Sequence, residues 1–189
     1  MNNEIEYVEE GHVYLYKGLY IVPSVTQILE KIFPDKYKNV PRETLMRKAS
    51  YGSQIHQYIE QYEKGIITIK LNYIQEASFG QYLRLKDKYN INVLEQEKIV
   101  NYKDIYAGRY DMLAEINGEI WLIDIKTTAS LDKEYLSWQL SLYEYAEKLN
   151  ADHLGSIWLP KKDIGRLVEI ERKSKKEINK LLEEVKKWK

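Results

Sequence analysis

The 189-residue chain contains no cysteine, and its 29 basic side chains are balanced by 29 acidic ones. Without thiols the chain offers no disulfide scaffold, no thiolate ligand for zinc or an iron–sulfur cluster, and no cysteine nucleophile. A net charge of zero argues against a protein that coats nucleic acid by charge alone, because such proteins are usually strongly basic. No apolar run approaches the roughly 18 residues that a membrane span needs, so we expect no contact with a membrane.

The composition, with 44% hydrophobic and 31% charged residues, is typical of a folded globular protein. The length suits one domain of ordinary size, and we expect residues 1–189 to form it. The N-terminus is acidic and lacks the basic start and apolar run of a signal peptide, which favours a cytoplasmic location.

Charge is unevenly distributed along the chain. Residues 161–189 contain 11 lysines and arginines against six acidic residues, so the rest of the chain is net acidic. Two interpretations stay open for this segment: a solvated terminal helix, or a basic flank lying along a polyanion beside an acidic site.

Apolar periodicity, turn signals and caps predict a mixed order of helices and strands. Ser24 with Gln27 three residues later is a capping-box pattern that starts a helix, and Gly65 ends another. The expected strands lie at about 12–16, 20–22, 93–100, 106–116, 119–126, 154–159 and 166–170, and the expected helices at about 24–33, 42–64, 73–89, 132–149 and 174–188.

This order predicts an α/β fold of the mixed α+β kind, with one sheet and helices packed around it. Within it, residues 1–90 form a mainly helical N-terminal part and residues 91–170 the sheet core. Residues 171–189 form a basic C-terminal helix.

The dipeptide Asn117-Gly118 between two apolar-rich runs is a strong signal for a two-residue hairpin turn. Such a turn places residue 116 opposite residue 119, and Asp111 opposite Asp124 on the same face. The other face carries apolar residues that we expect in the core: Tyr110, Met112, Ala114 and Ile116 against Trp121, Ile123 and Ile125.

Two directly opposed carboxylates destabilise a sheet unless positive charge lies between them. A divalent cation, a shared proton, or the side chains of Lys126 and Arg109 could supply it, since Lys126 shares the face of Asp124 and lies opposite Arg109 in this register. Oxygen ligands of this kind suit Mg²⁺. A surface pair neutralised by the two cations is an equal alternative, and a bulge near Gly108 would shift the register.

Four sequence pieces, in this order, resemble the PD-(D/E)xK nuclease superfamily, and specifically its RecB-like branch of bacteriophage exonucleases and CRISPR-associated relatives. The pieces are Gly52-Ser53-Gln54-Ile55-His56, Gly108-Arg109-Tyr110-Asp111, Asp124-Ile125-Lys126 and Gln139-Leu140-Ser141-Leu142-Tyr143. The segment 22–29 is also similar to phage-encoded members. The residue before Asp111 is tyrosine rather than proline, as is usual in the branch, and the cysteines that bind an iron–sulfur cluster in the CRISPR-associated relatives are absent.

The resemblance implies a restriction-endonuclease-like core, with a central mixed sheet that includes the antiparallel hairpin 106–126 and is flanked by helices. It also implies that Asp111 and Asp124 are catalytic metal ligands, joined by the carbonyl of Ile125 and by His56. Lys126 would orient or deprotonate the attacking water, or stabilise charge on the phosphate.

Other matched positions would support the site or contact the substrate. Gln139 and Tyr143 lie four residues apart on one helix face. Gly52 shares the helix face of His56, where a missing side chain would let a strand or substrate approach. Arg109 is a further supporting candidate. Tyr106 and Tyr110 could stack on bases or pack in the core.

The expected function is therefore that of a Mg²⁺- or Mn²⁺-dependent deoxyribonuclease without an iron–sulfur cluster. An exonuclease that processes DNA ends in phage recombination or replication comes first, acting on linear ends or single strands in the cytoplasm of a bacterial host. It could act as a homo-oligomer or with a recombination partner protein. Alternatives are a flap-, junction- or site-specific endonuclease, a non-catalytic DNA-binding module, and a structural domain.

Overall fold

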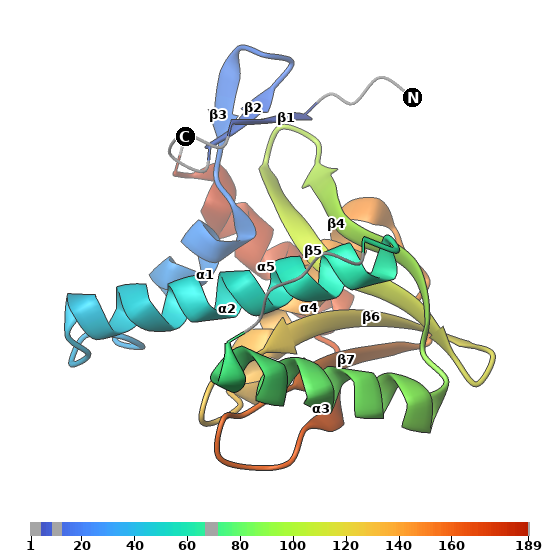
Figure 1. Cartoon of the computed structure of the whole chain (residues 1–189). Coiled ribbons are helices and arrows are strands. Elements are labelled where there is room, and N and C mark those ends of the chain that lie inside the picture. The colour runs from blue at the N-terminus through green and yellow to red at the C-terminus, as the bar shows by residue number, and fades with distance from the viewer. Residues whose placement is uncertain (1–4, 9–12, 67–71, 189) are drawn as a thin grey trace.

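The computed structural model describes residues 5–8, 13–66 and 72–188 (Figure 1). Its elements, in chain order, are β1 (Ile5–Val8), β2 (Val13–Tyr16), β3 (Tyr20–Val22), α1 (Val25–Ile32), α2 (Arg42–Glu63), α3 (Tyr73–Tyr89), β4 (Asn92–Tyr102), β5 (Tyr106–Ile116), β6 (Glu119–Lys126), α4 (Lys133–Glu147), β7 (His153–Trp158), β8 (Arg166–Ile170) and α5 (Lys175–Lys186). The sequence predicted all of these except β1. The start of the strand expected at 12–16 lies outside the described residues.

Local caps explain where several helices begin. Ser24 accepts a hydrogen bond from the Gln27 amide at 3.0 Å, and the Gln27 side chain accepts one from the Ser24 amide at 2.8 Å. This confirms the capping box predicted before α1. Asn72 and Ser174 cap α3 and α5 with the same reciprocal pattern.

The main sheet has five strands in the order β4-β5-β6-β7-β8. All neighbouring strands are antiparallel except β6 and β7, which are parallel because α4 connects them as a crossover helix. The expected α/β fold with a central mixed sheet is thereby confirmed.

Helices cover both faces of this sheet (Figure 1). On one face α1, α4 and α5 pack around a core that includes Leu140 and Leu182. On the other face α2 and α3 pack over a second core that includes Ile55, Tyr82 and Ile123. The strands between these two cores are buried on both sides, as in other sheets with helices on each face.

The β5–β6 hairpin turns at Asn117 and Gly118, whose φ angles are 54° and 85°. Two consecutive positive φ angles are the requirement of a type I′ turn. Paired residues run from Ile116 opposite Glu119 to Met112 opposite Ile123. The predicted register is therefore confirmed over these five pairs.

Beyond Met112 the hairpin differs from the prediction. The paired positions end one step before Asp111 and Asp124, and Tyr110 packs in the α4-side core whereas Met112 packs in the α2-side core. Arg109 lies opposite Ile99 of β4, not opposite Lys126. The expectation of direct pairing was wrong here because β6 stops pairing with β5 after Ile123, and the Asp111 side chain instead accepts a hydrogen bond from the Ile125 amide.

The irregularity anticipated near Gly108 lies on the neighbouring strand. Gly108 pairs regularly with Val100, and the register of β4 against β5 shifts between Val93 and Glu95, where Leu94 is the extra residue. A bulge of this kind bends and twists the strand that carries it.

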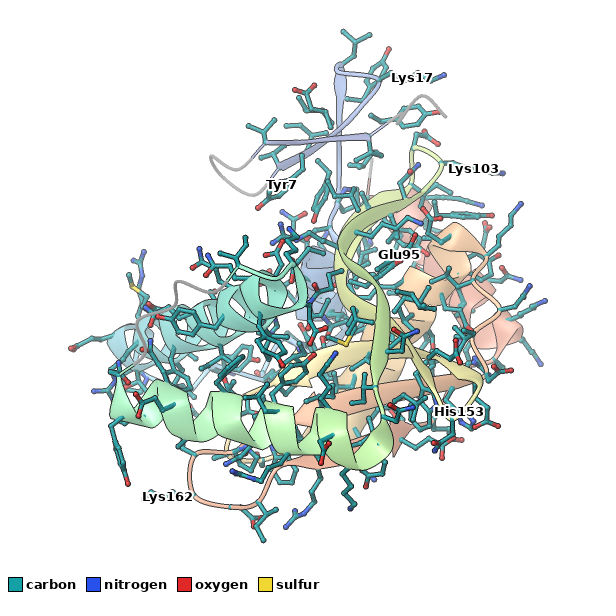
Figure 2. All side chains as sticks on the ribbon, turned by 45° about the vertical axis from the view of Figure 1, so that its right-hand side comes forward. Tyr7, Lys17, Glu95, Lys103, His153 and Lys162 are labelled. Atoms are coloured by element: carbon teal, nitrogen blue, oxygen red, sulfur yellow. The ribbon has the colours of Figure 1, made fainter. Side chains whose placement is uncertain are left out.

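The three N-terminal strands form a separate antiparallel sheet in the order β1-β2-β3. The expectation of one sheet was therefore wrong, because β2 and β3 pair with each other and with β1, not with the main sheet. Figure 2 shows the N-terminal sheet, marked by Tyr7 and Lys17, beside the β4–β5 turn at Lys103. It is joined to β5 where the Ala107 amide donates to the Pro23 carbonyl at 3.0 Å. Within the described ranges, every helix is too short or too polar to cross a lipid bilayer.

Gly108 is the point where β5, α1 and α4 approach most closely. A Cβ atom at this position would lie 2.5 Å from Tyr143 Cε1 and 3.1 Å from Val25 Cγ2. We expect Gly108→Ala to lower the free energy of unfolding by about 1–3 kcal/mol through overpacking, measured as a lower midpoint in urea.

The matched control is Gly80→Ala on α3, where the nearest atom to an added Cβ is the flexible end of Arg84 at 3.6 Å. Because alanine is the better helix former, this change should leave stability equal or raise it by up to about 1 kcal/mol. Equal effects of the two substitutions would contradict the packing described at Gly108.

Candidate active site

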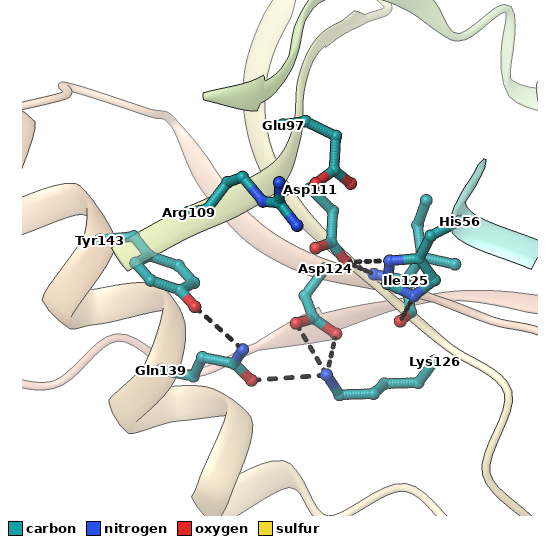
Figure 3. A network of polar contacts seen from close by, with 9 residues as sticks. All are labelled: His56, Glu97, Arg109, Asp111, Asp124, Ile125, Lys126, Gln139 and Tyr143. Atoms are coloured by element: carbon teal, nitrogen blue, oxygen red, sulfur yellow. Dashed lines mark hydrogen bonds and ion pairs between the residues drawn. The ribbon is translucent and has the colours of Figure 1, made fainter. Parts of the chain in front are cut away.

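Polar side chains from five elements meet, around the backbone of Ile125, where the β5 and β6 strands separate (Figure 3). The residues are His56 on α2, Glu97 on β4, Asp111 on β5, Asp124, Ile125 and Lys126 on β6, and Gln139 and Tyr143 on α4. The fold thus brings together residues that lie up to 87 positions apart in the chain.

The Asp111 side chain accepts a hydrogen bond from β6 that a backbone carbonyl of β5 would accept in a regular ladder. Its Oδ2 accepts a hydrogen bond from the Ile125 amide at 2.7 Å. The Nε2 atom of His56 lies 2.8 Å from the Ile125 carbonyl oxygen, and its Nδ1 lies 3.5 Å from Asp111 Oδ2. The imidazole, the carboxylate and the carbonyl that the sequence singled out are therefore neighbours in space.

Asp124 is almost completely buried, with an exposed fraction of 2%. The Nζ atom of Lys126 lies 2.8 Å from each of its carboxylate oxygens. Only Oδ1 accepts a hydrogen bond, and no donor among the described residues makes one to Oδ2. Burial raises the pKa of Asp124 to about 6, although Lys126 opposes this shift.

Lys126 is held by groups from two elements. Burial lowers its pKa, but the carboxylates of Asp124 and Asp111 outweigh burial, and the net shift is upward. Its ammonium also donates to Gln139 Oε1 at 3.5 Å, and the Gln139 amide donates to the Tyr143 hydroxyl at 3.3 Å. The helix face of Gln139 and Tyr143 therefore positions the lysine.

Glu97 is a site residue that sequence reasoning missed. It lies between two residues of β4 that pair with β5, Gln96 with Met112 and Lys98 with Tyr110, and so faces Asp111. One oxygen of Glu97, one of Asp111 and one nitrogen of His56 all lie within 4.8 Å of one another. The short connection after Tyr102 could have revealed this register, since it pairs Tyr102 with Tyr106.

The backbone and charge state of Glu97 are both unusual. Its φ of 49° is in the left-handed region, which non-glycine residues rarely adopt within a strand. Burial, and next the charge of Asp111, raise its pKa to about 7, although Arg109 lies 2.9 Å away as an ion-pair partner. Glu97 is therefore a second carboxyl group that lacks sufficient positive charge nearby.

Tyr37, in the connection between α1 and α2, was also missed. Burial raises the pKa of its hydroxyl group, and the charge of Lys126 lowers it. Its ring, which is 50% exposed, therefore lies within electrostatic reach of the site. No sequence pattern indicates that Tyr37 lies near the site, because the irregular connection between α1 and α2 determines where it lies.

Two predicted supporting residues have different surroundings from those expected. Arg109 binds Glu97 and stacks over Tyr7 at 5.4 Å, so it neutralises a carboxylate other than the two aspartates. A Cβ atom on Gly52 would meet Thr127 Oγ1 at 3.5 Å, an ordinary contact distance. Alanine would therefore fit at position 52, and packing does not require glycine there.

Tyr106 and Tyr110 resolve one of the open alternatives. Both are fully buried, and their hydroxyl groups donate to the Leu142 carbonyl and to Glu95 respectively. They belong to the core and are not available to stack on bases. His153 lies 2.7 Å from Glu169 at the opposite end of β7 from Trp158, away from these residues.

The donor set fits a hard divalent cation. Carboxylate oxygens, a backbone carbonyl and one imidazole are ligands that Mg²⁺ and Mn²⁺ accept. Burial raises the pKa of both Asp124 and Glu97 despite the neighbouring Lys126 and Arg109, so the cations present do not fully compensate these carboxylates. An ion at this position would supply the missing positive charge.

Comparison with known proteins agrees with this geometry. The model of the PD-(D/E)XK nuclease superfamily matches residues 29–188, and the chain belongs to this superfamily. The five-stranded mixed sheet flanked by helices is consistent with the restriction-endonuclease-like fold of its members. Membership implies a metal-dependent nuclease that acts on nucleic acid.

Among solved structures, the chain is similar to the crystal structure of SSO0001, with 19% sequence identity and a TM-score of 0.50. The alignment covers 89% of this chain and 76% of SSO0001. At this identity the similarity concerns the fold alone. A search of curated protein sequences found no match.

The pKa of Glu97 leads to a pH dependence in metal-free protein. Between its ordinary value of 4.5 and about 7, the folded chain retains a proton at Glu97 that the unfolded chain releases. Stability should therefore fall as pH rises through this window. We expect denaturant unfolding in the presence of a chelator to show this decline.

The Glu97→Gln variant separates this effect from other titrating groups. Because glutamine does not ionise, its stability should decline less between pH 5 and pH 7 than that of the unsubstituted protein. Parallel pH profiles of the two proteins would show that Glu97 ionises normally in the folded chain.

Proposed function

We propose that the chain is a Mg²⁺- or Mn²⁺-dependent deoxyribonuclease of the RecB-like type, most simply an exonuclease that processes DNA ends. The observation that carries this proposal is that His56 and Asp111 contact the backbone of Ile125, between Asp124 and its ion-pair partner Lys126. A phage or prophage role in recombination or replication follows from the motif resemblance.

In this proposal, the carboxylates of Asp111 and Asp124, the carbonyl of Ile125 and the imidazole of His56 hold the ion. Glu97 is placed to join them. When bound, the ion would neutralise charge on the scissile phosphate and lower the pKa of a water molecule. The side chains of His56 and Asp111 remain partly accessible, with exposed fractions of 26% and 15%.

Lys126 contributes positive charge beside the scissile phosphate. Its raised pKa keeps the side chain as an ammonium group, which suits it to orient water or stabilise phosphate charge. Gln139 and Tyr143 hold this ammonium in place from α4. Of the three roles considered for this lysine, deprotonation of water has the least support, because the raised pKa disfavours the neutral amine that a base must be.

Cleavage of labelled DNA tests the proposed activity. We expect purified protein to degrade linear DNA with Mg²⁺ or Mn²⁺ and not with chelator. Lys126→Ala and Asp124→Asn should each reduce the rate by about 100-fold or more. Lys180→Ala on the exposed face of α5 is a control of matched charge.

The DNA substrate separates the two nuclease alternatives. An exonuclease requires an end and should leave covalently closed circular DNA intact, whereas an endonuclease should cut it. Absence of cleavage with either metal, or full activity in both site variants, would exclude the proposed function.

Metal binding can be measured without catalysis. Titration calorimetry with Mn²⁺ and no DNA should show affinity that falls at least about tenfold in Asp111→Asn and in Glu97→Gln, because each loses an anionic ligand. Glu115→Gln, on an exposed position of β5, controls for the loss of one negative charge. Equal Mn²⁺ affinities in all four proteins would remove Asp111 and Glu97 from the ligand set.

A further inference from the structure

Three cations gather beside the candidate active site on α2 and on the segment that follows β7. The Nζ atom of Lys161 lies 3.4 Å from the ring centre of Tyr51 on α2. Arg47 and Lys48 come four and three residues before Tyr51, so all three share one face of the helix. Tyr51 itself is fixed by its hydroxyl group, which lies 2.7 Å from Ser78 Oγ on α3.

These cations lack neighbouring anions in the described part of the chain. Neither Arg47, Lys48 nor Lys161 forms an ion pair there, and Glu43, one turn before Arg47, is not within 4.0 Å of it. Asp163, close to Lys161 in sequence, binds Arg166 at 2.8 Å instead. Burial, and next the charges of Arg47 and Lys48, lower the pKa of Lys161.

Grouping like charges without a counter-ion costs free energy, and this cost is recovered when a polyanion binds. All three side chains are exposed, so packing of the protein interior does not explain why these like charges are grouped. At the end of α5, Lys186 pairs with Glu183 and Lys187 with Glu184, whereas Lys175, Lys176 and Lys180 form no ion pair among the described residues. What distinguishes the cations on α2 and after β7 is their place next to β6, since α5 packs on the opposite face of the sheet.

The segment that carries Lys161 is hydrogen-bonded to the end of β6, the strand that carries Asp124 and Lys126. The Leu159 amide, two residues before Lys161, donates to the Lys126 carbonyl at 2.7 Å. On the α2 side, a Cβ atom placed on Gly52 would lie 3.5 Å from Oγ1 of Thr127, the residue that follows Lys126. Figure 2 shows Lys162, next to Lys161, at the opposite end of the main sheet from His153.

The spacing along α2 suits a nucleic-acid strand. Lys48 precedes His56 by two helical turns, a rise of about 12 Å. A B-form strand advances about 3.4 Å per phosphate along its axis, so this length spans three or four phosphates. A strand whose scissile phosphate lies at His56 and Lys126 can therefore contact the cluster with phosphates a few nucleotides away.

We propose that Arg47, Lys48 and Lys161 form a contact surface for the phosphate backbone of the DNA strand that enters the active site. This inference rests on the proposed nuclease function. It assigns the electrostatic contact to α2 and the β7–β8 connection, and not to the basic surface of α5.

The salt dependence of DNA binding tests this assignment. Fluorescence anisotropy with a labelled oligonucleotide, in chelator so that no cleavage occurs, gives the affinity at several salt concentrations. For the triple variant Arg47→Ala, Lys48→Ala and Lys161→Ala, the slope of log affinity against log salt should shrink by about 2 for a single strand and nearly 3 for a duplex.

A second triple variant, Lys175→Ala, Lys176→Ala and Lys180→Ala on α5, removes the same charge from the opposite face of the sheet. Its slope should match that of the unsubstituted protein. An unchanged slope in the α2 variant, or a larger change in the α5 variant, would overturn the assignment. The assignment would also be overturned if the α2 variant changed the salt slope for RNA of the same sequence but left the salt slope for DNA unchanged.

Cleavage assays on the same proteins separate the two proposals. If DNA is cut, the α2 variant should show a KM at least about tenfold higher at 0.1 M salt, with kcat nearly unchanged, because the cluster touches no reacting atom. Unchanged KM and slope would refute the contact surface while the nuclease stands. Binding that depends on the cluster, without cleavage under Mg²⁺ or Mn²⁺, would refute the nuclease while the surface stands.

Discussion

The hydrogen bond from the Ile125 amide to Asp111 Oδ2 is the contact on which the arrangement of the site depends. At the point where the β5–β6 pairing ends, while β5 continues to pair with β4, this side chain replaces a backbone acceptor. It thereby keeps Asp111 beside the strand that carries Asp124 and Lys126, while the Ile125 carbonyl remains in contact with His56. The separation of the two strands creates the space in which their carboxylates can share a ligand.

Charge in this space is unbalanced in a way that a divalent cation would correct. Three carboxyl groups meet here, with one lysine on Asp124 and one arginine on Glu97. Burial raises the pKa of both Asp124 and Glu97, because the two cations do not compensate for lost hydration. The zero net charge of the chain therefore conceals two concentrated regions: an acidic site, and a cluster of cations beside it on α2 and the β7–β8 connection.

Sequence patterns were sufficient where local chemistry determines structure. The capping box at Ser24, the turn at Asn117 and the order of helices and strands all depend on neighbouring residues, and the structure confirms them. They failed where tertiary pairing decides: β6 stops pairing with β5 after Ile123, and the bulge at Leu94 precedes the strained Glu97. No local signal reports where two neighbouring strands stop pairing or where a bulge shifts their register.

The function proposed for the protein depends on where a divalent cation binds. A crystal of the protein soaked in Mn²⁺, with anomalous diffraction data collected at the manganese absorption edge, would locate it directly. We expect an anomalous peak within coordination distance of His56, Asp111, Asp124 and the Ile125 carbonyl. A peak only at another acidic cluster, such as that around His153, or no peak at a saturating Mn²⁺ concentration, would contradict the proposed metal site.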